Sequence, residues 1–166
     1  MYSTPQLLSA IANEFRILKH LGSKVTSTNK DHKLTDSQRS TEELQKYIAY
    51  SLPAQIKLMV LGTRDGDLYN NGLKAGDAFT YDQFDAALDN AYASIEADIN
   101  SVTGEQRDET ISIRGQTAPR THFLIEYVLE FLGAYKMQLF LQVKHAGDAT
   151  LGTYNLWAGM DEPAKE

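Results

Sequence analysis

The longest regular pattern of the chain is TAPRTHFLIEYVLEFLGAYKMQLFLQVKHAG, residues 117–147. Its main apolar side chains recur at steps of three and four residues, which places them on one face of an α-helix. They are Leu124, Val128, Phe131, Tyr135 and Leu139. Thr117, with Pro119 just inside, predicts the start of this helix, and the pattern runs nearly to Gly147. Because a helix of this kind must bury its apolar face against other elements, its neighbours decide the fold.

Three further helices are predicted before this stretch, at residues 4–22, 40–62 and 80–104. Each begins with a capping signal: Thr4 followed by Pro5, Ser40 with Glu43, and Thr80 with Gln83. Each is expected to end at a glycine and carries apolar residues at helical spacing. Pro53 is expected to bend the second of these helices near its middle, because proline removes a backbone hydrogen bond.

The segments between the predicted helices are polar or rich in turn residues. Residues 23–39 are aperiodic, and residues 63–79 are expected to form a long surface connection rather than a packed element. Residues 105–117 are expected to be a loop, because the brief alternation at Thr110 to Ile113 has no evident partner strand. The tail, residues 148–166, is expected to pack against the helices around the single tryptophan.

These elements predict an all-α four-helix bundle with a packed C-terminal tail, since four amphipathic helices can bury their apolar faces against one another. A chain of 166 residues suits a single domain, residues 1–166. The long connection between the second and third helices favours a crossover there.

Composition excludes several classes of function. The chain has no cysteine, so disulfides, cysteine-ligated metals and thiol nucleophiles are absent. A net charge of −6 without a visible basic cluster argues against nucleic-acid binding. The first residues do not resemble a secretory signal, and no apolar segment is long enough to span a membrane. The sequence therefore predicts a cytoplasmic protein with no membrane partner.

Three short motifs carry a family resemblance along nearly the whole chain. They are Gln38-Arg39-Ser40 followed by Glu43 and Leu44, the run from Tyr135 to Leu139, and the closing Tyr154-Asn155-Leu156-Trp157. In their order and spacing, the chain resembles the DinB-like, or YfiT-like, superfamily of small bacterial four-helix bundles. The resemblance implies the same bundle fold.

The resemblance also implies a divalent metal site with one histidine on the second helix and two histidines four residues apart on the fourth. The matching positions here are Tyr47, Phe131 and Tyr135. All three are aromatic, and a phenylalanine ring has no lone pair for a metal. We therefore expect no metal and no other cofactor, and the thiol-dependent transferase and isomerase activities near this superfamily do not carry over.

The aromatic trio has three interpretations. The favoured one is a filled pocket, in which three rings replace the folding energy of a metal. The second is a small-molecule pocket in which the phenols of Tyr47 and Tyr135, together with Gln138, supply hydrogen bonds. The third is a misalignment by one helical turn.

A weaker alternative metal site consists of His122, Glu126 and Glu130, which recur at steps of four on the last helix. A solvated or interface face is favoured for this stripe. His20 and His145 each lie near a helix end, where the helix dipole favours a positive charge. His32 lies in a polar connection and has no partner that the sequence identifies.

Two functional hypotheses follow from these residues. The first is a non-catalytic binding or interaction protein that forms a homodimer, because its helices carry apolar residues off their main stripes. These include Leu7, Ile17, Ile125, Leu132, Phe140 and Leu141. The second is an enzyme with a displaced or metal-free site, of the thiol-dependent transferase or isomerase type or a hydrolase.

Overall fold

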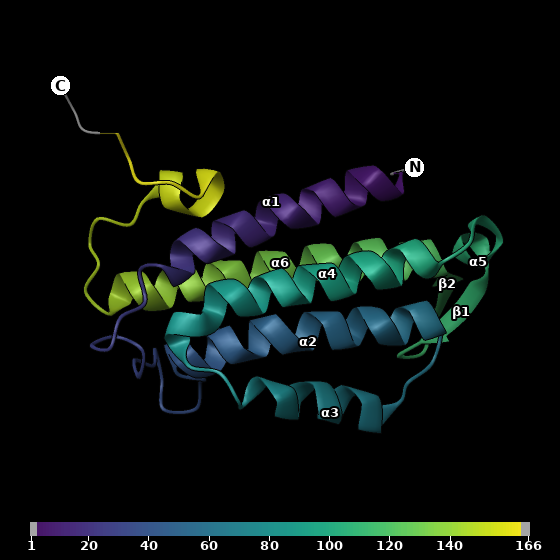
Figure 1. Cartoon of the computed structure of the whole chain (residues 1–166), viewed down its shortest axis with the longest axis horizontal. Coiled ribbons are helices and arrows are strands. Elements are labelled where there is room, and N and C mark those ends of the chain that lie inside the picture. Colours follow the sequence, from purple (N-terminus) through teal and green to yellow (C-terminus); the bar gives the residue numbers. More distant parts are fainter. Residues whose placement is uncertain (1–2, 164–166) are drawn as a thin grey trace.

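The computed structural model describes residues 3–163 as a bundle of long helices with a small β-hairpin at one end (Figure 1). The elements in chain order are α1 (Thr4–Gly22), α2 (Thr41–Leu61), α3 (Gly66–Gly76), η1 (Tyr81–Gln83), α4 (Phe84–Ser101), α5 (Gly104–Asp108), β1 (Thr110–Ile113), β2 (Gln116–Pro119), α6 (Arg120–His145) and η2 (Tyr154–Ala158). The predicted all-α bundle is confirmed. The predicted domain of residues 1–166 extends beyond the described residues at both ends.

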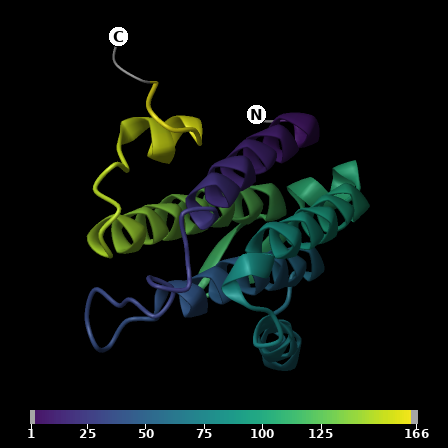
Figure 2. The ribbon, with the colours of Figure 1, turned by 60° about the vertical axis from the view of Figure 1, so that its left-hand side comes forward.

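Four helices enclose the core. Both α1 and α2 pack against α4 and α6, so that α1 and α2 occupy opposite corners of the bundle (Figure 2). Apolar side chains with no exposed surface come from all four helices, among them Ile11, Leu18, Leu44, Leu52, Leu88, Ile95 and Leu139. In Figure 1, α2 and α4 run in the same direction and α3 returns between their ends. The predicted crossover between the second and third bundle helices is therefore confirmed.

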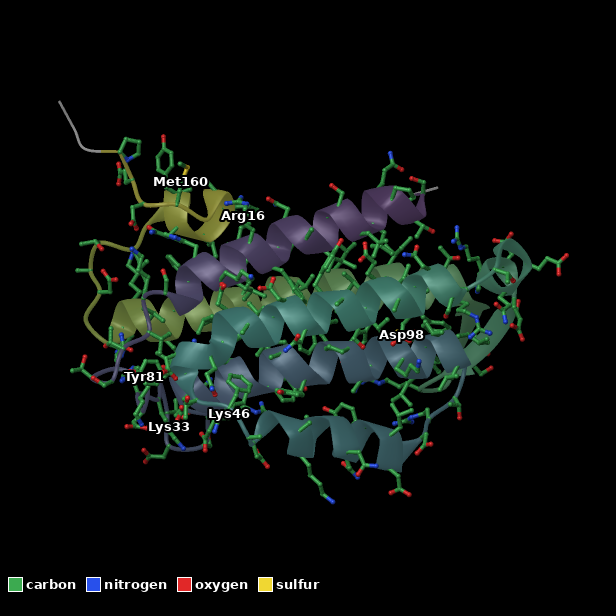
Figure 3. All side chains as sticks on the ribbon, viewed as in Figure 1. Arg16, Lys33, Lys46, Tyr81, Asp98 and Met160 are labelled. Carbon is green, nitrogen blue, oxygen red and sulfur yellow. The ribbon has the colours of Figure 1, made fainter. Side chains whose placement is uncertain are left out.

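A partly buried ion pair also joins two of these helices. The carboxylate of Asp98 on α4 pairs with Lys57 on α2, and Figure 3 shows Asp98 on the side of α4 that faces α2.

Among the helices formed by residues 3–163, none combines the length and the apolar character needed to cross a bilayer.

Most helix ends follow the predicted capping signals. Ser40 and Glu43 form the expected reciprocal capping box, and Gly62 ends α2 in the left-handed conformation. The start of α1 differs by one residue, because Ser3 rather than Thr4 accepts the hydrogen bond from the amide of Gln6. The helix α2 continues through Pro53 to Leu61.

The segment predicted as a long surface connection contains α3, which packs against α2. Asp65 begins this helix by accepting hydrogen bonds from the amides of Asp67 and Leu68. A Cβ atom at Gly76 would lie 2.7 Å from the ring of Tyr50. This glycine therefore permits a close helix contact, whereas in the sequence it resembles a turn residue.

The prediction of a loop at residues 105–117 was wrong. Strand β1 pairs antiparallel with β2, and the strands are joined by Arg114 and Gly115, both with positive φ. Positive φ at both central residues is the geometry of a type I′ hairpin turn. The partner strand contains Thr117 and Pro119, which were predicted to begin the last helix, so α6 starts only at Arg120. Similarly, Gly104 begins α5 rather than ending the third bundle helix.

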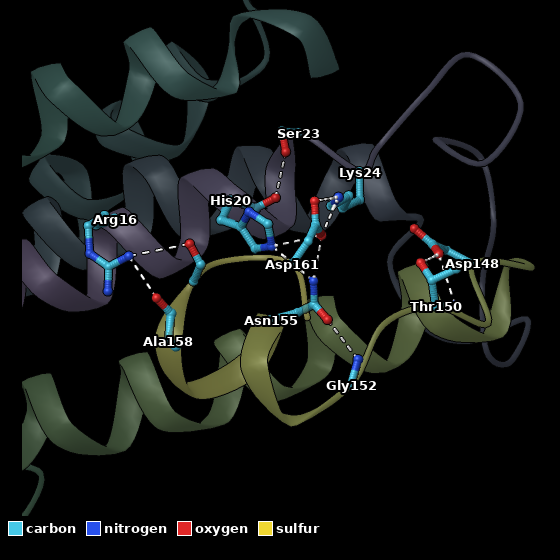
Figure 4. A network of polar contacts seen from close by, with 11 residues as sticks. Arg16, His20, Ser23, Lys24, Asp148, Thr150, Gly152, Asn155, Ala158 and Asp161 are labelled. Carbon is cyan, nitrogen blue, oxygen red and sulfur yellow. Dashed lines mark hydrogen bonds and ion pairs between the residues drawn. The ribbon is translucent and has the colours of Figure 1, made fainter. Parts of the chain in front are cut away.

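The C-terminal tail packs on α1 as predicted, through a network of polar contacts (Figure 4). Arg16 donates to the carbonyl of Ala158 at 2.8 Å, and Lys24 pairs with Asp161 at 2.6 Å. Asn155 lies 3.0 Å from Nε2 of His20, and burial lowers the pKa of this histidine. The tryptophan does not anchor the tail, since 68% of its surface is exposed.

Candidate functional site

The three aromatic positions identified from the sequence come together where α2 faces α6. Tyr47 lies on α2, whereas Phe131 and Tyr135 lie one turn apart on α6 and so share a face. Ring centroids are 5.9 Å apart for Tyr47 and Phe131, 5.0 Å for Tyr47 and Tyr135, and 4.5 Å for Phe131 and Tyr135. Tyr127, one turn earlier on α6, adds a fourth ring 6.0 Å from Phe131. We call these four residues the aromatic cluster.

Polar contacts orient the ring on α2. The hydroxyl of Tyr135 donates to the hydroxyl of Tyr47 at 3.5 Å, which is a long hydrogen bond. The guanidinium of Arg39 lies 3.8 Å above the centre of the Tyr47 ring, within the range of a cation–π interaction. The ring of Tyr47 is therefore held from the α6 side by a phenol and from the connection before α2 by a cation.

A cavity of about 740 Å³ opens beside the aromatic cluster. Its walls come from α2, the start of α3, the hairpin turn and the first half of α6. The rings pack against one another without closing this space, whose size is within the usual range for small-molecule sites. Gln138, which the sequence placed in the pocket, is not among the residues that line it.

Two phenols in this cavity, those of Tyr69 and Tyr127, are hydrogen-bond donors at neutral pH. Burial raises the pKa of Tyr127 far above its usual value, and neighbouring Tyr47 raises it further. Burial also raises the pKa of Tyr69, whose hydroxyl lies 3.2 Å from that of Ser51. Because both groups stay protonated, neither can serve as a general base near pH 7.

Two arginines, Arg64 and Arg114, lie at the rim of the cavity and are exposed. Neither guanidinium forms an ion pair with any residue between 3 and 163. One carboxylate oxygen of Asp65 accepts from the amides that begin α3, and Glu130 is the other acidic group of the lining. The cavity therefore offers two cations and two carboxylates, together with phenol donors and flat apolar rings.

Arg114 is placed at this rim by the hairpin turn. Its φ of 53° lies in the left-handed region, which a non-glycine residue adopts at some energetic cost. The guanidinium of Arg114 lies 5.4 Å from the centre of the Tyr127 ring, within the range of a cation–π contact. Strained residues are often found at ligand sites, where the surrounding structure fixes them.

Comparisons with known proteins identify the fold. No protein-family model matches the chain, and no curated protein does. Among solved structures, the DinB-like protein YjoA from Bacillus subtilis superposes with a TM-score of 0.70 at 21% identity, over 90% of this chain and 96% of that one. This chain has the DinB-like fold.

Two structures of the mycothiol-dependent maleylpyruvate isomerase are also similar to this DinB-like chain. One is a point mutant, with a TM-score of 0.59 at 12% identity, and the other has a TM-score of 0.55 at 11% identity. Both matches cover 87% of this chain and 66% of the isomerase, which is the longer protein. At these identities the similarity concerns the fold, and the fold expected from the sequence resemblance is confirmed.

The side chains at the expected metal position of this DinB-like bundle do not fit a metal ion. Phe131 offers no donor atom, and the two phenols beside it are poor ligands for a divalent cation while protonated. Within residues 3–163, no group of three or more histidine, cysteine, aspartate or glutamate side chains could hold a metal. The aromatic cluster therefore lacks the ligands that a metal-dependent reaction would need.

The alternative stripe on α6 is only partly assembled. His122 and Glu126 form a contact of 3.2 Å across one helical turn. Glu130, the third member, lies against the cavity beside the aromatic cluster. The pair is half-exposed, in keeping with the solvated face that the sequence favoured.

The cavity residues that the sequence did not identify include Arg64, Tyr69, Arg114 and Tyr127. Arg64 and Tyr69 come from the segment predicted as a connection, and Arg114 from the one predicted as a loop. Tyr127 lies beside the predicted apolar stripe of α6. One local signal for the hairpin was available in the sequence, the dipeptide Arg114-Gly115. Glycine at the second position of a two-residue turn favours a β-hairpin.

Proposed function

We propose that this DinB-like protein is a metal-free binding protein for a small anionic molecule with a flat apolar body. The observation that carries the proposal is the cavity of about 740 Å³ that combines the aromatic cluster with two arginines free of carboxylate partners within residues 3–163. Guanidinium groups form strong, bidentate hydrogen bonds to carboxylates and phosphates. The rings supply faces on which a planar ligand stacks.

The chemistry of the lining supports binding rather than catalysis. Tyr69 and Tyr127 remain protonated because burial raises their pKa, so they donate hydrogen bonds to an anion and do not abstract protons. The polar groups surround the aromatic cluster as a small number of oriented donors, which is typical of a specific ligand site.

The proposal is tested by isothermal titration with three naphthalene derivatives that share a body and differ in charge. These are 1-naphthoate, 1-naphthylmethanol and 1-naphthylmethylamine. We expect the carboxylate to bind most tightly. The double variant Arg64→Gln, Arg114→Gln is expected to weaken it by roughly 10- to 100-fold, since hydrogen bonds to charged groups contribute about 1.5–3 kcal/mol.

The matched control for this experiment is Arg107→Gln, because Arg107 lies outside the cavity. It should leave naphthoate binding unchanged. Equal affinity for the three probes would contradict an anion site. Tighter binding of the amine would also contradict it and would indicate that Glu130 governs the charge preference.

We also propose that the protein forms a homodimer through an exposed apolar stripe of α6. Leu129, Met137 and Leu141 expose 63%, 40% and 45% of their surface and recur at multiples of four residues. Gly133 completes the spacing, and no atom lies within 4 Å of the position of its missing side chain. A twofold axis across such a stripe brings the same side chains of two copies together and removes them from water.

Light scattering after size-exclusion chromatography tests the dimer. We expect a mass of two chains for the wild type and of one chain for the variant Leu129→Glu, Met137→Glu. Leu61→Glu is the matched control, because Leu61 is 53% exposed at the end of another helix. A wild type that stays monomeric at about 100 μM would contradict the dimer, because interfaces of standard size bind with micromolar or lower dissociation constants.

A further inference from the structure

Two histidines that are 113 positions apart in sequence meet at the end of the bundle opposite the hairpin. His32 belongs to the connection between α1 and α2, and His145 is the last residue of α6. Nδ1 of His145 lies 3.0 Å from Nε2 of His32. The ring centroids are 5.0 Å apart, the ring planes are inclined by 27°, and the two nitrogens are at hydrogen-bond distance.

Hydrogen bonds elsewhere hold both histidines in place. The carbonyl of His32 accepts from the amide of Thr41 at 3.0 Å, at the first residue of α2. One turn before His145, the side-chain amide of Gln142 donates to the carbonyl of Arg39 at 2.7 Å. The connection before α2 and the end of α6 are therefore joined independently of the imidazoles, which keeps the two rings preorganised.

The separation of the two nitrogens suits a shared metal ion. Nitrogens bound at about 2.0–2.1 Å to one zinc ion are about 2.9–3.4 Å apart for angles between a right angle and a tetrahedral one. The observed 3.0 Å falls within this range. Both rings must turn so that their nitrogens point at one ion beside the line between them, and His145 is exposed and has room to do so.

We propose that His32 and His145 form a binding site for a divalent transition-metal ion of the kind that imidazole prefers: Zn²⁺, Ni²⁺ or Cu²⁺. The bound ion fastens the connection before α2 to the C-terminal end of α6, where the helix dipole also favours a cation. No third histidine or carboxylate joins the pair in the described part of the chain, so water completes the coordination.

This site is independent of the cavity beside the aromatic cluster. Tyr135 and His145 are ten residues apart on α6, which corresponds to about 15 Å along the helix. Ligand binding in the cavity and metal binding at the histidine pair can therefore fail or succeed separately.

Thermal unfolding of the full chain without an affinity tag, with added ZnCl₂, NiCl₂ or CuCl₂, tests the proposal. We expect at least one metal to raise the melting temperature by on the order of 5–10 °C at about a hundredfold excess over its dissociation constant. A bound metal raises the melting temperature because unfolding separates the two histidines and so releases the ion. Calorimetric titration should give one ion per chain.

The variant His145→Ala should abolish the shift while leaving the circular dichroism spectrum unchanged, because this side chain is exposed. His122→Ala is the matched control, since His122 is also an exposed histidine of α6 and contacts Glu126 and the ring of Phe123. It should keep the full shift. In NMR spectra, ring protons of His32 and His145 should respond to Zn²⁺ before those of other histidines.

Three results would overturn the proposal. The first is an unchanged melting temperature with all three metals, and the second is a shift that survives in His145→Ala. The third is a shift that disappears in His122→Ala, which would assign the metal to His122 and Glu126 instead.

Discussion

Replacement of Arg120 by methionine is expected to lower the free energy of unfolding by about 3–5 kcal/mol, although this residue does not line the cavity described above. Arg120 is only 4% exposed. Its guanidinium donates to the carbonyls of Met59 and Val60, to the carbonyl of Gln106 at 3.0 Å, and to the carboxylate of Glu109 at 2.6 Å. One side chain thus joins the end of α2 to α5 and to the residue before β1.

The expected loss comes mainly from the backbone carbonyls, because Glu109 is half-exposed and can be hydrated without its partner. Carbonyls at the end of a helix that are buried without a donor cost about 1–3 kcal/mol each. Urea unfolding followed by circular dichroism measures the change. Arg120→Lys should recover only part of it, since an ammonium group lacks the fork of donors that reaches several acceptors.

Arg64→Met is the matched control, since Arg64 is exposed and forms no ion pair within residues 3–163. It should change the free energy of unfolding by no more than about 0.5 kcal/mol. A loss below about 1 kcal/mol for Arg120→Met would show that water replaces the guanidinium at these carbonyls.

The long helices could be predicted because each one repeats the same physical signal many times. The stripe of α6 and the capping box of Ser40 and Glu43 are local patterns, and both form as expected. Phe131 and Tyr135 share a face of α6 because of their spacing, whereas their convergence with Tyr47 was expected only from the family resemblance. Repetition along a helix therefore predicts the scaffold, and the resemblance adds one wall of the cavity.

The opposite wall could not be predicted, because it depends on elements whose signals are short or ambiguous. Strand β1 has only four residues, and its partner strand begins with the polar Gln116. Gly76 resembles a turn residue, yet in the structure it allows α3 to approach the ring of Tyr50. Since Arg64 and Arg114 are positioned by these elements, the cationic rim becomes visible only in three dimensions.

The contact between His32 and His145 has the same origin. Each histidine has an ordinary local interpretation, one as a polar loop residue and one as a cation at a helix end. Their contact spans 113 positions and depends on how the connection before α2 folds back on the bundle. Sequence spacing predicts metal ligands that share a helix, whereas ligands from distant segments require the fold.

Truncation of Phe131 to alanine is expected to destabilise the protein by about 3–5 kcal/mol, since it removes a large ring from a packed environment. Phe131 is 3% exposed and contacts the other three rings of the aromatic cluster within 6.0 Å. Tyr47→Phe and Tyr135→Phe remove one long hydrogen bond of 3.5 Å and are expected to cost about 1 kcal/mol or less. Leu129→Ala, at a position 63% exposed on the same helix, is the control and should be nearly neutral.

The comparison of these variants separates packing from hydrogen bonding in the aromatic cluster. If the rings act by packing, urea unfolding gives Phe131→Ala a much lower free energy of unfolding than either phenylalanine variant. The phenylalanine variants then bind 1-naphthoate more weakly than the wild type, because each has lost one hydrogen-bond donor. If either phenylalanine variant costs more than Phe131→Ala, the phenols rather than the buried ring stabilise the contact between α2 and α6. The aromatic cluster would then owe its stability to a polar network rather than to packing.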